Sequence, residues 1–139
     1  IVPVLTGRSV SQPDRKSAEK KVLRWRKIAA EAAKQSQRGV VPEVSGLISL
    51  REAAEECRAG ELSLLFYEGE GERISALLPD SPPERIRIFI GPEGGFQREE
   101  VGMLTENGAR AATLGPRILR TETAPIAALS VLMFALGEI

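Results

Sequence analysis

The sequence predicts an α/β domain with a mostly parallel sheet and helices on both faces. Short apolar segments with the composition of strands alternate along the chain with segments that have helical periodicity. Glycine-rich and arginine-containing segments stand where predicted strands end and helices begin. Because alternating strands and helices build parallel sheets, whose ligands bind at the carboxyl ends of the strands, this order indicates both the architecture and the place of the site.

Each element has its own sequence signal. Gly39 ends the first helix, which has an apolar and a basic face, and Pro42 keeps the next strand from full pairing. Ser49 and Glu52 form a capping box that begins the second helix. The last helix is almost wholly apolar, so we expect it to be buried. In chain order we expect strands at 1–5, 40–44, 62–67, 86–90 and 111–114, and helices at 18–38, 49–58, 99–106 and 124–136.

The composition limits the classes of function. A chain of 139 residues, 42% hydrophobic and 27% charged, is long enough for one folded domain. Its 19 basic and 19 acidic residues balance, so a nucleic acid would have to bind a local patch. One cysteine and no histidine exclude an internal disulfide, a structural zinc site and histidine-based catalysis. The least polar stretch is too short to span a membrane, so we expect a cytoplasmic protein without metal or membrane partner.

The segment 90–96 carries three glycines between a predicted strand and a predicted helix. Glycine lets the backbone approach a ligand closely, and ligands bind at this edge of α/β sheets. The spacing is neither that of a dinucleotide-binding fingerprint nor that of a phosphate-binding loop. A tight turn that requires positive φ is the alternative interpretation, and the sequence leaves it open.

The segment 114–124 also joins a strand to a helix. Thr121 or Thr123 could cap the helix, and Glu122 could complement its dipole. Capping does not explain Arg117 and Arg120, because positive charge is unfavourable at the start of a helix. An anionic ligand or RNA explains the two arginines as well as a structural ion pair does.

Together the segments 90–96 and 114–124 resemble the C-terminal half of the RsmE family, bacterial enzymes of the SPOUT superfamily. Segments 3–10 and 31–38 are similar to the same family. The resemblance implies a transferase that moves the methyl group of S-adenosyl-L-methionine to N3 of one uridine in the decoding region of 16S rRNA, within the small ribosomal subunit. It also implies a deep trefoil knot in the chain after Ile86, an exception to the rule that folds avoid knots.

The resemblance also implies which residues form the site. Uracil N3 must lose its proton, and a nearby cation would stabilise the negative charge that the base gains. Arg120 is the first candidate for that cation and Arg8 the second, while Glu122 is a candidate for orienting an arginine or accepting the proton. The family's cofactor pocket consists largely of main chain from the knot loops. By resemblance its lining residues are Phe66, Tyr67, Glu68, Gly91, Glu93, Gly94, Leu114, Gly115, Ile118, Leu119 and Thr123.

The basic face of the first helix is a candidate RNA-binding surface, although a solvated charged face is the alternative explanation. The resemblance further implies a homodimer in which the final helix and the knot pack against the partner. The candidate RNA-binding residues are Arg8, Lys20, Arg24, Lys27, Arg38 and Arg117.

The resemblance covers nearly the whole chain. We therefore expect 1–139 to be one SPOUT methyltransferase domain, incomplete at its N-terminus and without the family's N-terminal PUA-like RNA-binding domain. Two other functions compete with this prediction. One is a non-catalytic RNA-binding module, whose RNA binding would depend strongly on salt and ignore the cofactor. The other is a SPOUT methyltransferase that acts on the 2′-oxygen of ribose in another RNA.

Overall fold

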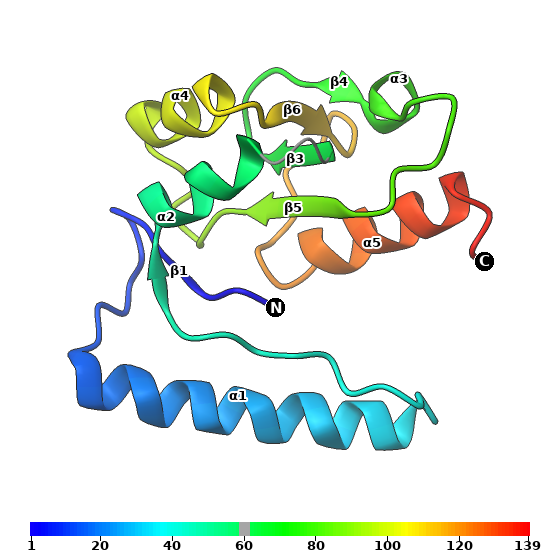
Figure 1. The fold of residues 1–139 in the computed structure, drawn as a ribbon. Coiled ribbons are helices and arrows are strands. Elements are labelled where there is room, and N and C mark those ends of the chain that lie inside the picture. Colours follow the sequence, from blue (N-terminus) through cyan, green and yellow to red (C-terminus); the bar gives the residue numbers. More distant parts are fainter. Residues whose placement is uncertain (59–61) are drawn as a thin grey trace. The chain divides into compact units, whose positions relative to one another are not determined.

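The computed structural model describes residues 1–58 and 62–139. The chain divides into two compact units (Figure 1). We call residues 1–5 and 11–50 the helical unit, and residues 6–10 and 51–139 the sheet unit. Each is described on its own.

The helical unit consists of one long helix and a short parallel strand pair. Strand β1 (Val4–Leu5) pairs with β2 (Ile48–Ser49). Helix α1 (Arg15–Gln35) begins after Asp14, whose carboxylate accepts the N–H of Ser17 at 3.1 Å. This side chain satisfies one of the backbone donors left free at the first turn, so the helix begins three residues before the predicted Ala18.

Two predictions in this unit are wrong in detail. Helix α1 ends because Gln37 takes a left-handed backbone conformation (φ 55°), before the chain reaches Gly39. Segment 40–44 forms no strand. Backbone pairing with the first residues of the chain begins only where Ser45 N–H donates to the carbonyl of Ile1 at 3.0 Å.

The sheet unit contains a four-stranded parallel sheet in the order β4-β6-β3-β5. The predicted parallel α/β architecture is therefore confirmed. A short β4 and α3 lie in segment 72–77, for which the sequence predicts neither a strand nor a helix. The elements are α2 (Leu50–Glu55), a 3₁₀ turn (Glu56–Arg58), β3 (Leu62–Phe66), β4 (Glu72–Arg73), α3 (Ile74–Leu77), β5 (Ile86–Ile90), α4 (Arg98–Glu106), β6 (Arg110–Thr113) and α5 (Ala124–Ala135).

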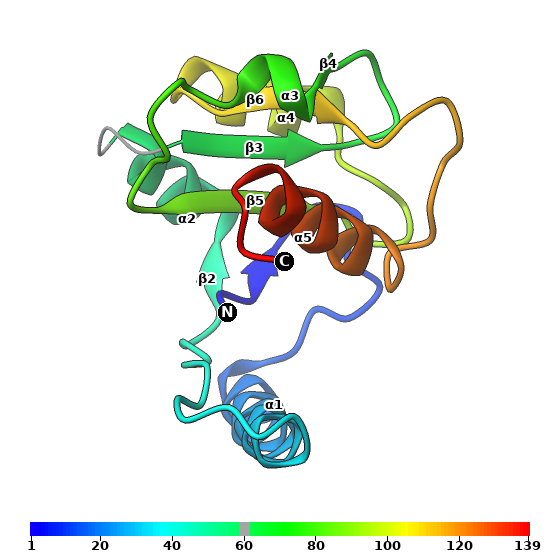
Figure 2. The same ribbon diagram turned by 90° about the vertical axis from the view of Figure 1, so that its right-hand side faces the viewer.

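Strand β3 is the centre of the core. It lies between β5 and β6, and its Leu64 and Leu65 are fully buried. Figure 2 shows α5 on one side of this sheet and α2 and α4 on the other. On the α5 side the buried cluster consists of Leu64, Phe66, Ile74, Leu77, Ala112, Ala128 and Leu132.

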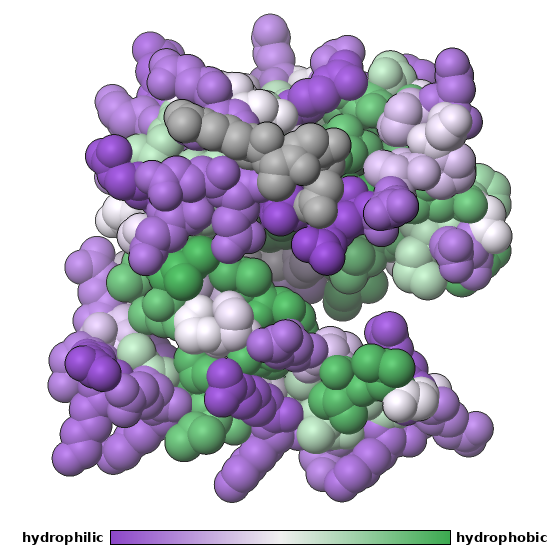
Figure 3. Space-filling view, in the orientation of Figure 1, coloured by the Kyte–Doolittle hydropathy of each residue, from purple (hydrophilic) through white to green (hydrophobic). Residues whose placement is uncertain are grey.

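The expectation that the last helix is buried is wrong for most of its surface. Only Ala128 and Leu132 of α5 are buried. A sheet covers one face of a helix that packs on it, and the remaining apolar side chains of α5 lie outside that contact. Figure 3 shows the resulting apolar surface over α5. The exposed side chains are Ile126, Leu129, Val131, Met133 and Phe134.

Among the described residues, no helix is long and apolar enough to cross a membrane. The same residues contain no group of three acidic, cysteine or histidine side chains that could hold a metal ion.

Candidate active site

Three loops of the sheet unit meet at one edge of the sheet because the strands before them are parallel. They follow β3, β5 and β6 and comprise residues 67–71, 91–97 and 114–123. The strand order places β3 between β5 and β6, so the loop after the central strand is flanked by the other two. This is the edge at which open α/β sheets bind ligands.

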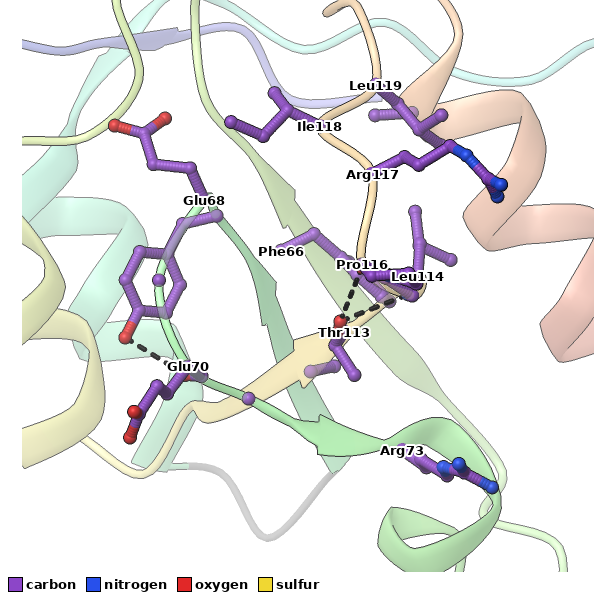
Figure 4. A pocket seen from close by; sticks show the side chains of 16 residues that line it. Phe66, Glu68, Glu70, Arg73, Thr113, Leu114, Pro116, Arg117, Ile118 and Leu119 are labelled. Carbon is purple, nitrogen blue, oxygen red and sulfur yellow. Dashed lines mark hydrogen bonds between the residues drawn. The ribbon is translucent and has the colours of Figure 1, made fainter.

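A hollow of about 680 Å³ lies among these loops, and we call it the large hollow (Figure 4). Its volume is within the range of small-molecule sites, roughly 300–1,000 Å³. Its wall is formed by the end of β3, the segment that leads into β4, and the chain from β6 to α5. The lining residues are Phe66, Tyr67, Glu68, Gly69, Glu70, Gly71, Arg73, Ala112, Thr113, Leu114, Gly115, Pro116, Arg117, Ile118, Leu119 and Ala124.

Ile118 is unusual for an apolar residue, because 81% of it is exposed although it lines the large hollow. In Figure 4 its side chain points across the opening toward the loop that carries Glu68, whereas Arg117 extends to the other side, toward α5. An exposed aliphatic side chain in a concave site is suited to cover an apolar part of a ligand.

A small hollow of about 60 Å³ adjoins the large one, since the two share Phe66, Tyr67, Glu68, Leu119 and Ala124. Its other walls come from the loop after β5 and from Thr121. These further lining residues are Ile90, Gly91, Pro92, Gly95 and Phe96.

Two glycines at the hollows have backbone conformations that other residues rarely adopt. Gly95 has a φ of 66°, and a Cβ there would lie 2.5 Å from Oε2 of Glu68. Gly115 has a φ of 103°, but a Cβ there would meet nothing within 4 Å. The first glycine therefore leaves room for the Glu68 carboxylate, while the second only allows the chain to turn.

The segment between Gly115 and α5 supplies no side chain that caps the helix. The carbonyl of Arg120 accepts the N–H groups of Thr123 and Ala124, each at 2.9 Å, and neither Thr121 nor Thr123 caps the helix with its side chain. Within residues 1–58 and 62–139, Arg117, Arg120 and Glu122 form no ion pair. Neither structural explanation of this segment, capping by threonine or an ion pair, applies.

A loop from the start of the chain lies against the loop after β5. The guanidinium of Arg8 donates from Nη1 to the carbonyl oxygen of Gly94 at 2.9 Å. The N–H of Gly7 donates to Oε1 of Glu100 at 2.7 Å. These contacts fix Arg8 beside a loop whose Gly91 and Gly95 line the small hollow.

The structure gathers most of the predicted pocket residues, but not all of them. Glu93, Gly94 and Thr123 line neither hollow, and neither do Arg8, Arg120 and Glu122. Arg120 stands between two residues that line the small hollow. The predicted pocket residues found on a wall are Phe66, Tyr67, Glu68, Gly91, Leu114, Gly115, Ile118 and Leu119.

The other predicted positions lie in two places. Arg117 lines the large hollow, while Lys20, Arg24, Lys27 and Arg38 are exposed in the helical unit. Sequence reasoning missed segment 69–73, which forms one wall of the large hollow. The sequence predicts neither a strand nor a helix there, and only the pairing of β4 with β6 brings the segment to the site.

These features define a class of protein: a parallel α/β domain with a hollow at the carboxyl edge of its sheet, walled largely by residues of the loops that follow the strands. Residues 1–133 match the model of the RNA methyltransferase domain, and the chain belongs to that family.

Named relatives agree with this assignment and with the predicted resemblance to the RsmE family. The chain is 41% identical to ribosomal RNA small subunit methyltransferase E of Bacillus subtilis, over 96% of its own length and 55% of that protein's. It thus spans about half the length of the curated relatives it matches.

Solved structures extend the comparison to the fold. A putative methyltransferase from Legionella pneumophila, in complex with the bound cofactor SAM, superposes with a TM-score of 0.88 at 36% identity, covering 96% of this chain and 54% of that one. Ribosomal RNA small subunit methyltransferase E from Neisseria gonorrhoeae, bound to S-adenosyl methionine, gives a TM-score of 0.86 at 34% identity, covering 95% and 53%.

Proposed function

We propose that this domain transfers a methyl group from S-adenosyl-L-methionine to N3 of a uridine in the decoding region of 16S rRNA. The observation that carries the proposal is the large hollow at the carboxyl edge of the sheet, with Ile118 exposed in its mouth. Two structures that share this fold hold the same methyl donor.

The residues present fit that donor. The N–H and C=O groups of Arg117 and Ile118 have no hydrogen-bond partner among the described residues, so they are free to bind polar edges of an adenine ring. Glu68 and Glu70 line the same hollow and suit a positively charged ligand. The residues that would hold the donor are the predicted pocket residues found on a wall of the hollows, with Gly69, Glu70, Gly71 and Gly95 in addition.

The bound donor would supply an electrophilic methyl group. Leu119 lines both hollows, and Arg120 is the next residue in the chain. From this position the charge of Arg120 can stabilise a uracil ring that has lost the N3 proton. Arg8, fixed to Gly94, is the second candidate for this role. Glu122 can accept the proton or orient an arginine, because it has no ion-pair partner among the described residues.

The proposal includes the deep trefoil knot of the SPOUT superfamily, with 114–123 threaded against 91–95 in the single methyltransferase domain 1–139. The strand order supports it: after β5 the chain passes through α4 to β6, on the far side of β3, and then returns to pack α5 against β5. Because of this path, the loops after β5 and β6 both reach the loop after β3.

RNA binding would use the basic face of α1 together with Arg38, which follows the helix. Lys20, Arg24, Lys27 and Arg38 are exposed and form no ion pair among the described residues. Unpaired cations of this kind are suited to phosphates, and binding should weaken steeply with salt. We place this activity in the cytoplasm, where the small ribosomal subunit is the partner.

We further propose that the domain forms a homodimer through α5. The helix carries no charged side chain, and Ile126 and Phe134 are 68% and 75% exposed. An uncharged apolar helix face can meet its own copy across a two-fold axis without leaving a buried charge unpaired.

Calorimetric titration of S-adenosyl-L-methionine into the chain tests the cofactor site. Ile118→Ala should weaken binding by roughly 5- to 30-fold, which corresponds to about 1–2 kcal/mol of apolar contact with the ligand. Ile139→Ala is the matched control, because Ile139 is also largely exposed, at 69%, but lies outside both hollows. Equal affinities for the two variants, or no binding by folded wild-type chain, would contradict the proposal.

A further inference from the structure

Glu100 is a buried carboxylate that the proposed reaction does not use. It lies in the first turn of α4, and only 9% of it is exposed. Ionised side chains are rarely buried without hydrogen-bond partners, and both oxygens of Glu100 have one. Oε2 accepts the N–H of Gln97 at 2.8 Å, and Oε1 accepts the N–H of Gly7 at 2.7 Å.

The two hydrogen bonds have different consequences. The bond from Gln97 is local and completes half of a capping box at the start of α4. The bond from Gly7 joins residues 93 positions apart in the sequence. Helix capping requires only the first, so the second is left to be explained by what it holds in place.

The bond from Gly7 holds the residue next to Arg8. The loop 6–9 turns back on itself, with the N–H of Ser9 donating to the carbonyl of Thr6 at 3.1 Å. Arg8 leaves this turn and reaches the carbonyl of Gly94 at 2.9 Å. Glu100 thus fixes the backbone on one side of Arg8 while Gly94 fixes its guanidinium.

We propose that Glu100 is a positioning residue for the methyl transfer, acting through Gly7 to hold Arg8 beside the loop that lines the small hollow. This inference rests on the proposed function. It assigns Glu100 no contact with the methyl donor, because Glu100 lines neither hollow. Its loss should therefore slow transfer to the rRNA without weakening the binding of the donor.

Glu100→Gln is the informative variant. An amide has one acceptor oxygen and one NH₂ group, so it can accept only one of the two N–H groups. Glu99→Gln is the matched control, since Glu99 lies in the same turn of α4, is exposed and has no partner among the described residues. The two variants change charge equally, but only Glu100→Gln replaces one of the two oxygens that accept the N–H groups of Gln97 and Gly7.

Hydrogen exchange at the Gly7 amide tests the tether without any activity. Glu100→Gln should speed that exchange by about tenfold or more, the effect expected from the loss of one charge-assisted hydrogen bond. Glu99→Gln should leave the exchange rate unchanged. Unchanged exchange at Gly7 in both variants would overturn the proposal.

Kinetics with small ribosomal subunits test the consequence. In Glu100→Gln, kcat should fall about tenfold while the dissociation constant of S-adenosyl-L-methionine stays within about twofold. In the double variant Arg8→Ala, Glu100→Gln, kcat should be no lower than in Arg8→Ala alone, because Glu100 acts through Arg8. A further tenfold fall in kcat in the double variant, or a normal kcat in Glu100→Gln, would overturn the positioning role. If the wild-type chain transferred no methyl group to the rRNA, the proposed function itself would be contradicted.

Discussion

Replacing Phe134 by serine tests the proposed dimer most sharply. Phe134 is 75% exposed in the single chain, and full burial of such a side chain contributes about 1.5–3 kcal/mol. Three quarters of that is roughly 1–2 kcal/mol per copy. A two-fold interface counts each substitution twice, so Phe134→Ser should cost about 2–4 kcal/mol of dimer stability.

This loss raises the dimer dissociation constant by about 30- to 1,000-fold, which sedimentation velocity over a series of concentrations can measure. Leu23→Ser is the control, because Leu23 is 58% exposed on α1 and lies outside the proposed interface. A wild-type chain that sediments as a monomer, or a Phe134→Ser chain that sediments as wild type, would refute the reasoning.

Two further predictions concern stability, one in the sheet unit and one in the helical unit. Leu64→Ala removes a fully buried side chain from the central strand and should lower the free energy of unfolding by about 2–5 kcal/mol in a denaturant titration. Hydrogen bonds from Ser17 hold the pKa of Asp14 below its ordinary value of 3.8, so the ionised carboxylate stabilises the start of α1. That stabilisation is complete above the ordinary pKa and is lost as pH falls below it. Circular dichroism should therefore show α1 helicity falling at acid pH in the wild type, and Asp14→Asn should remove this dependence.

The long elements of the fold could be predicted from the sequence because their signals are local. Strand β5 has its predicted bounds, and α4 begins one residue before its prediction. Segment 72–77 has too few residues for a periodic signal, and it becomes a strand and a helix through pairing of β4 with β6 and burial of Ile74. Such tertiary stabilisation has no local signature.

The site was predicted less completely than the fold, for a similar reason. Motifs mark loops that change direction sharply, so the segments that contain Gly95 and Ile118 were found. Which loops line the hollow depends on the order of the strands in the sheet, and neither periodicity nor spacing in the sequence determines that order. The exposure of α5 could not be predicted either, because an apolar pattern shows that a helix avoids water but not whether its own chain covers it.

Nucleoside mass spectrometry of 16S rRNA tests the central claim most directly. Small ribosomal subunits that lack the modification would be incubated with the chain and S-adenosyl-L-methionine, and the RNA would then be digested to nucleosides. The proposed function predicts uridine methylated at N3, at a level that depends on Arg120. A methyl group on the 2′-oxygen of ribose, or salt-dependent RNA binding by a folded chain without any methylated nucleoside, would contradict it.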